Sequence, residues 1–197
     1  MASKLTQIAQ ELSASNIKQG SSESISWLKR KIQQVRSPSN LAASIAREKF
    51  RYENQLRPGG LYCFYYDPKG RDTLPYYDVF PMVLVLEQYP DGFLGLNLHY
   101  LPFQYRVAFL NKLLKYASLD RNDEIERLRV TYDILSASKR MKEFRPCLKR
   151  YLFGHVQSKL LAIQPNEWQT AVYLPLQHFV KAGAGRVWQE SIEKIGT

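Results

Sequence analysis

Cysteine and histidine are scarce in this chain of 197 residues, which contains two cysteines and three histidines. Cys63 and Cys147 lie far apart, and neither cysteines nor carboxylates stand at ligand spacing beside His99, His155 or His178. Zinc motifs place their ligands in pairs a few residues apart. The sequence therefore predicts no metal site and two buried thiols in a reducing cytosol.

Long apolar runs and phosphate-binding loops are also missing. No apolar stretch approaches the roughly 20 residues that cross a bilayer, and the amphipathic start MASKLTQIAQELSAS lacks the apolar centre of a signal peptide. The segment 58–60 is too short for a phosphate loop, and the segment 181–186 lacks the Lys-Ser/Thr ending. We therefore expect a protein that stays where it is made, in the cytoplasm, with no membrane partner and no cofactor.

Catalytic arrangements are equally hard to find in this sequence. A nucleophile pair of Cys147 and His155 has no local support. Asp67, Asp72 and Asp78 are close in sequence, and paired carboxylates can perform acid–base chemistry or bind a cation. Aspartate beside proline or glycine is, however, mostly a turn former. The sequence predicts a non-enzymatic binding or assembly protein without catalytic residues.

Positive charge and tyrosine are present in excess. The chain carries a net charge of +10 and contains 13 tyrosines. Residues 1–58 contribute +6, residues 59–103 contribute −3, and residues 104–163 contribute +7. A mildly acidic, aromatic middle is therefore flanked by two basic segments. Such segments attract nucleic acid, anionic lipid or an acidic protein, and charge alone leaves these alternatives open.

The hydrophobic pattern predicts an α+β fold, with a small curved antiparallel sheet or SH3-like barrel flanked by N-terminal and C-terminal helices. The expected helices cover 3–14, about 21–35, 39–55, 102–116, a segment that begins near Asp123, 165–172 and the chain from Val187. The expected strands cover 61–66, 79–86 and 93–100, with a strand or helix near 155–163. A Pro-Gly breaker at 57–60 precedes the first strand, the segment 74–78 is an ordered aromatic loop, and Asp91-Gly92 makes a hairpin turn. We divide the chain into a helical extension for partner docking (1–56), the barrel or sheet (57–103) and a mainly helical part packed on the sheet (104–197).

Two groups of residues are the candidate partner-binding sites. The first is an apolar helical stripe with cations beside it: Ile25, Leu28, Ile32, Val35, Lys29, Arg30 and Lys31. The second is a basic cluster interleaved with aromatic residues: Lys139, Arg140, Lys142, Lys149 and Arg150, with Arg145 as a less certain member. Clustered cations with nearby rings suit a phosphate backbone. A solvated helix face or an acidic protein partner remains the alternative.

Residues 61–102 and 144–181 together resemble a known family, most specifically in Asp67-Pro68-Lys69 and in the Leu-Pro-Tyr-Tyr-Asp motif at 74–78. They are similar to small virion structural proteins of T-even-like contractile-tailed phages. The resemblance implies a role in the virion, with other virion proteins as partners in a larger symmetric assembly. It leaves two locations open. The first is a tail or baseplate component that joins neighbouring subunits, and the alternative is a DNA-binding protein that protects the packaged genome ends.

A looser likeness concerns small-barrel toxin ribonucleases. Residues 59–62 and 81–85 echo two strands of those enzymes, but the loop from Asp67 to Val79 has a single arginine, Arg71, and lacks a convincing catalytic set. We therefore expect no ribonuclease activity.

Overall fold

The structure, a computed structural model, describes residues 4–17, 21–33, 52, 53, 55–117 and 142–196. The helices are α1 (Lys4–Ala14), α2 (Ser22–Gln33), α4 (Phe103–Ala117), α6 (Trp168–Tyr173) and α7 (Ala184–Gly196). The strands are β1 (Tyr52–Glu53), β2 (Leu61–Cys63), β3 (Tyr77–Asp78), β4 (Met82–Tyr89), β5 (Gly92–Asn97), β6 (Leu148–Leu152), β7 (Leu160–Ile163) and β8 (Phe179–Val180). Short 3-10 helices are η2 (Leu98–Tyr100), η3 (Lys142–Cys147), η4 (Phe153–His155) and η5 (Pro165–Glu167). None of the helices within these ranges has the length and apolar character needed to cross a membrane.

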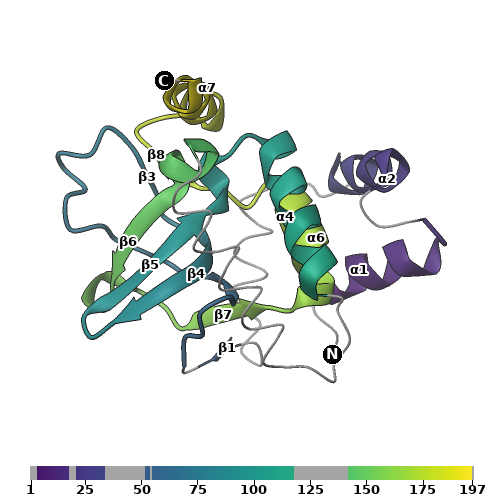
Figure 1. The fold of residues 1–197 in the computed structure, drawn as a ribbon, viewed down its shortest axis with the longest axis horizontal. Helices are drawn as coiled ribbons and strands as arrows, with labels where there is room; N and C mark the ends of the chain where they lie inside the picture. Colours follow the sequence, from purple (N-terminus) through teal and green to yellow (C-terminus); the bar gives the residue numbers. More distant parts are fainter. Residues whose placement is uncertain (1–3, 18–20, 34–51, 54, 118–141, 197) are drawn as a thin grey trace.

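The main sheet has six antiparallel strands in the order β1-β7-β2-β4-β5-β6. A second, two-stranded ladder joins β3 to β8. Helices α1, α2, α4 and α6 lie together on one side of the sheet, and α7 lies beyond its upper end in Figure 1. This arrangement confirms the predicted α+β class and the antiparallel sheet.

The sheet is strongly curled but open. The rings of Phe64, which directly follows β2, and Tyr151 in β6 have centroids 5.3 Å apart. In a flat sheet the three strand spacings between β2 and β6 would separate them by about 14 Å. A bridge from Tyr66 to Val156 draws the same two chain segments together. Because β1 and β6 remain the two edges of the ladder, the SH3-like barrel alternative is corrected to an open sheet.

Side chains on the two faces of the sheet form two separate cores. Leu61 and Cys63 belong to the larger core, which the helices complete, whereas Tyr62 between them belongs to the smaller core inside the curl. Successive strand residues point to opposite faces, so this division follows from the alternation of the strand. Helix α6 contacts α1, α2 and α4, and its Ala171 and Val172 are almost completely buried. The larger core therefore centres on α6.

The N-terminal helices are packed onto this larger core. Leu5, Ile8 and Leu12, which follow the helical spacing of α1, are all buried in it. Thr6 also donates a 2.7 Å hydrogen bond to the Oε1 of Glu167. The helix expected over 39–55 falls largely outside the described residues, but its end at 52–53 is corrected to strand β1, which pairs with β7. A docking role for residues 1–56 stays a prediction.

The C-terminal segment supplies two strands of the main sheet that the sequence did not clearly reveal. Strand β6 follows η3 and pairs with β5, and strand β7 lies between β1 and β2. Charged residues at 149 and 150 concealed β6, because edge strands often carry cations that oppose further pairing. The helix expected near Asp123 lies outside the described residues. Helices over 165–173 and 184–196 agree with the predicted ones.

Two glycines in turns are required for different reasons. Gly59 has a φ of 80° and follows Pro58 in a turn closed by a 3.0 Å hydrogen bond from the Gly60 N–H to the Arg57 carbonyl. This is the left-handed position of a type II turn. Gly92 instead begins β5, where an added Cβ would lie 1.9 Å from the carbonyl oxygen of Tyr151. The predicted hairpin turn at 91–92 is confirmed. Gly92 is required there because its lack of a side chain lets strand β6 approach closely.

Candidate nucleic-acid interface

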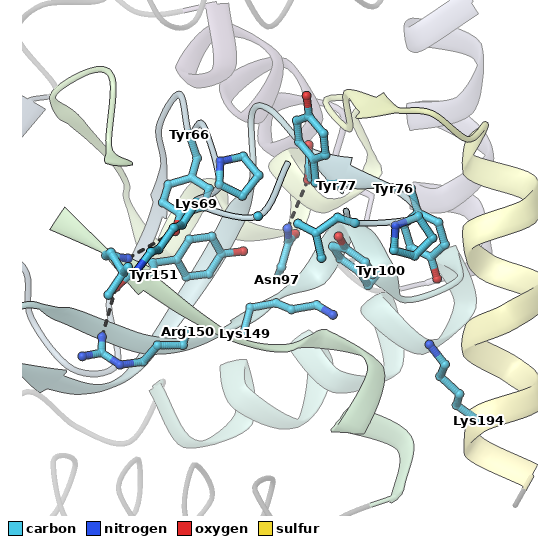
Figure 2. Close-up of a pocket in the computed structure, with 16 residues that line it drawn as sticks. Tyr66, Lys69, Tyr76, Tyr77, Asn97, Tyr100, Lys149, Arg150, Tyr151 and Lys194 are labelled. Carbon is cyan, nitrogen blue, oxygen red and sulfur yellow. Dashed lines mark hydrogen bonds between the residues drawn. The ribbon is translucent and has the colours of Figure 1, made fainter. Parts of the chain in front are cut away.

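A pocket of about 450 Å³ opens between the loop after β2, strand β6 and helix α7 (Figure 2). Tyrosines and cations supply most of its long side chains. The lining residues are Tyr66, Pro68, Lys69, Gly70, Leu74, Pro75, Tyr76, Tyr77, Asp78, Asn97, Tyr100, Lys149, Arg150, Tyr151, Leu152 and Lys194. Four of these residues are cationic and one is a carboxylate, so the lining has a net charge of +3. The volume suits a small molecule or a single nucleotide.

Two lysines direct their amino groups toward the same part of the pocket. Figure 2 shows Lys149 reaching in from β6 and Lys194 from α7. The ammonium of Lys149 lies 4.3 Å from the ring centroid of Tyr100, close enough for a cation–π interaction. Burial lowers the pKa of Lys149, and the charge of Lys194 lowers it further. Within the described part of the chain, Lys149 has no carboxylate partner, so a bound anion would neutralise the charge of its ammonium group.

The tyrosine walls are fixed by ring contacts. Tyr66 and Tyr151 meet edge to face with centroids 4.9 Å apart, and Tyr76 lies 6.0 Å from Tyr100. The Tyr76 hydroxyl donates a 2.8 Å hydrogen bond to Glu190 of α7. Burial, followed by this hydrogen bond, raises the pKa of Tyr76 to about 12. These phenols are therefore neutral, rigid groups at neutral pH.

The loop 67–75 forms one rim of the pocket, and both Lys181 and an ion pair within the loop stabilise it. The ammonium of Lys181 donates to the carbonyl oxygens of Arg71, Asp72 and Leu74 at 2.6, 3.0 and 3.1 Å. Arg71 also forms an ion pair with Asp67 at 3.1 Å. Because Lys181 adopts a φ of 69°, its backbone is itself in an unusual conformation for a non-glycine residue. Contacts within the chain therefore hold the rim in place.

A buried polar network supports the floor of the pocket. Asp78 Oδ2 accepts hydrogen bonds from His99 Nδ1 at 2.6 Å and Asn97 Nδ2 at 3.2 Å, while Oδ1 accepts from the backbone N–H groups of Phe80 and His178. Burial alone would raise the pKa of Asp78, but His99 and these hydrogen bonds lower it overall. The carboxylate is therefore ionised. Because both of its oxygens already accept hydrogen bonds, it is not available as a catalytic base.

The predicted catalytic and metal candidates do not converge. Asp67 pairs with Arg71, Asp72 is exposed and Asp78 is buried, so the three carboxylates share no site. Burial raises the pKa of Cys147 to about 12, which keeps its thiol protonated and unsuited to nucleophilic attack. No cluster of three metal-ligating side chains occurs among the residues with described positions. Both cysteines are buried thiols, as expected.

The second candidate group is only partly brought to the pocket. Lys149 and Arg150 line it. Arg150 also forms an ion pair with Asp91 and lies 4.3 Å from the ring centroid of Tyr89, so it ties β6 to the β4–β5 hairpin. Lys142 is exposed on η3. Lys139 and Arg140 lie outside the described residues.

The first candidate group lies on α2. Leu28 is fully buried within the chain's own larger core, so it is not available to contact a partner. The predicted docking would therefore depend on the other apolar residues of the stripe. The side chains of Ile25, Ile32 and Lys29 and the whole of Val35 lie outside the described part. Arg30 is exposed, and Lys31 forms an ion pair with Glu11 of α1. Docking of this stripe on a partner remains a prediction.

Several pocket residues were not predicted from the sequence. Lys69, Tyr100 and Lys194 were missed because they are isolated cations or ordinary core-like aromatics in their local segments. The Leu-Pro-Tyr-Tyr-Asp motif at 74–78, recognised as an ordered aromatic loop, was the available signal, since all five residues line the pocket.

A pocket with converging cations and tyrosine walls is typical of proteins that bind nucleic acid through phosphate charge and ring contacts. Residues 43–191 match the family described as phage T4 terminal DNA protecting protein, and the chain belongs to that family. It is a virion component of a T4-like phage, made in the host cytoplasm. No curated protein and no solved structure shows significant similarity to the chain. The family favours protection of genome ends over the tail or baseplate location expected first.

Proposed function

We propose that this protein binds the ends of the packaged phage DNA and shields them from exonucleases without performing chemistry on them. The observation that carries the proposal is the pocket that joins Lys69, Lys149 and Lys194 to a wall of tyrosines. The family description supplies the type of DNA site, a terminus. Protection then requires only that the protein occupy the end on which an exonuclease must act.

The charge distribution supports DNA over an acidic protein as the partner of this face. The single carboxylate of the pocket lining, Asp78, is satisfied by four hydrogen bonds, whereas Lys149 lacks an acidic partner among the described residues. Phosphates neutralise such cations and release counterions, which supplies affinity for any sequence. Sequence-independent affinity is what a protein that covers genome ends requires.

The size of the pocket supports an end over an internal site. A volume of about 450 Å³ accommodates a phosphate or one nucleotide, whereas the duplex must remain outside. The loop 67–75 and helix α7 both contribute side chains to the lining of the pocket, so the duplex would abut this face with its end. An internal stretch of duplex would contact only cations on the surface around the pocket and would not reach those inside it.

The test compares linear and closed-circular duplex DNA of one sequence with the full-length protein. We expect linear DNA to be bound more tightly and to resist a 5′- or 3′-exonuclease, while an endonuclease still cuts within it. A Lys149→Glu/Lys194→Glu variant should lose protection, and Lys159→Glu, which reverses an exposed cation outside the pocket, should retain it. Circular dichroism and thermal unfolding confirm that each variant folds.

Equal affinity for circular and linear DNA, or no exonuclease resistance, would overturn the proposal. In that case co-purification with tail or baseplate chains, unaffected by nuclease treatment, would identify the protein as a structural component that joins virion subunits.

A further inference from the structure

We propose that the pocket is specific for a terminal phosphomonoester, which Lys149, Lys194 and the hydroxyl of Tyr100 hold together. This inference deepens the proposed function and rests on it. It identifies the chemical group by which an end differs from the rest of the DNA, and nothing in the family description assigns such a site.

The Tyr100 hydroxyl is the first observation. Tyr100 is 7% exposed, and its ring lies under the ammonium of Lys149 at 4.3 Å. Among the described residues no hydrogen bond holds its hydroxyl, and this hydroxyl is not one of the fully buried polar atoms, so it is open to the pocket that Tyr100 lines. A phenol hydroxyl that faces a pocket can donate a hydrogen bond to a bound anion. Tyr66 differs, because its hydroxyl accepts a hydrogen bond from the Leu152 N–H at 3.3 Å.

The second observation is the approach of two like charges. Lys149 comes from β6 and Lys194 from α7, and Figure 2 shows both side chains reaching toward the same part of the pocket. The charge of Lys194 contributes to the lowered pKa of Lys149. Glu190 of α7 accepts hydrogen bonds from Tyr76 and Arg186, and these lower its pKa, with a smaller contribution from the charge of Lys194. A bound anion between the two ammonium groups would relieve their repulsion.

A terminal phosphate fits this site better than an internal one. A phosphomonoester carries a charge of about −1.5 to −2 at pH 7, whereas an internal phosphodiester carries one charge per strand position. It also has three oxygens free to accept hydrogen bonds, which matches two ammonium groups and one hydroxyl. An internal phosphate is esterified on both sides, so it cannot enter a pocket of about 450 Å³ without its flanking nucleotides.

The test measures binding of the full-length protein to one blunt duplex prepared with 5′-phosphate, 3′-phosphate or hydroxyl ends, beside the closed circle. We expect a terminal phosphate to strengthen binding about tenfold or more over the hydroxyl end, as charge-assisted hydrogen bonds do. The arm with the larger gain identifies the strand end that occupies the pocket. Equal gains in both arms also support a phosphomonoester site.

Conservative variants separate this site from general charge. Lys149→Met and Tyr100→Phe should abolish the preference for phosphorylated ends while retaining some preference for linear over circular DNA. Lys159→Met and Tyr105→Phe, which alter a cation and a phenol outside the pocket, should keep the full preference. If hydroxyl and phosphorylated ends bind equally well while linear DNA is still preferred, the phosphate site is wrong and the proposed function stands. If linear and circular DNA bind alike, both fail.

Discussion

The imidazole Nδ1 of His99 lies 2.6 Å from Oδ2 of Asp78, and both side chains are buried beneath the pocket. Burial lowers the pKa of His99, and the neighbouring Asp78 offsets this only in part. His99 Nε2 is buried without a hydrogen-bond partner among the described residues, which suits a neutral ring that donates from Nδ1 to an ionised carboxylate. The backbone carbonyl of His99 also accepts hydrogen bonds from Arg106 and Trp188, so His99 joins η2 to α4 and α7.

This pair predicts an acid-sensitive fold. The unfolded chain protonates His99 near its ordinary pKa of 6.5, while the folded chain does so only at lower pH. The unfolded state therefore binds more protons, and the free energy of unfolding should decrease as pH falls below about 6.5. Asp78, whose pKa is lowered from 3.8, should add a further loss below that value. Urea unfolding across pH 4–8 measures this dependence. His99→Asn should make it shallower between pH 5 and 7, and an unchanged slope would contradict the assignment.

The close approach of Gly92 to β6 predicts a selective loss of stability. In Gly92→Ala the new Cβ would lie 1.9 Å from the backbone oxygen of Tyr151, so β6 must shift. Overpacking of this kind costs about 1–3 kcal/mol. We expect a lower urea midpoint and weaker binding to DNA ends, because β6 carries Lys149. Gly154→Ala is the control, since nothing among the described residues lies within 4 Å of the position that its methyl group would take, and a comparable loss there would refute the explanation.

Removal of the Lys181 ammonium should loosen the rim of the pocket. Lys181→Met eliminates three hydrogen bonds to carbonyl oxygens of the loop 67–75. Because these groups are exposed, global stability should change by less than about 1 kcal/mol. Hydrogen exchange should nevertheless accelerate in residues 68–76, and affinity for DNA ends should fall. Lys159→Met should do neither. Unchanged exchange in the loop would show that Lys181 does not order it.

The basic surface of η3 should contribute affinity without end preference. Lys142 and Arg145 are exposed on η3, the 3-10 helix that leads into β6. If both bind phosphates, Lys142→Gln/Arg145→Gln should make the slope of log affinity against log salt shallower by about 0.9 for each phosphate that is no longer neutralised. Linear and circular DNA should be affected equally in a salt titration. A change confined to linear DNA would place these residues at the end itself.

Local patterns in the sequence were sufficient for many of the elements. The stripe of Leu5, Ile8 and Leu12 predicts α1, and the two apolar runs around residues 90–92 predict the β4–β5 hairpin. Pro58 and Gly59 predict the turn before β2. In each case the deciding interactions lie within a few residues, so spacing and turn chemistry reveal them.

Pairing between distant segments was decided only by the tertiary structure. Strand β7 lies in the sheet between β1 and β2, and β6 pairs with β5 from more than fifty residues away. That pairing brings Lys149 beside Tyr100, and the packing of α7 brings Lys194 to the same pocket. The sequence determined that the chain is basic and rich in tyrosine. It could not determine which cations meet which rings, because strand order and helix packing depend on burial of the whole core and not on local periodicity.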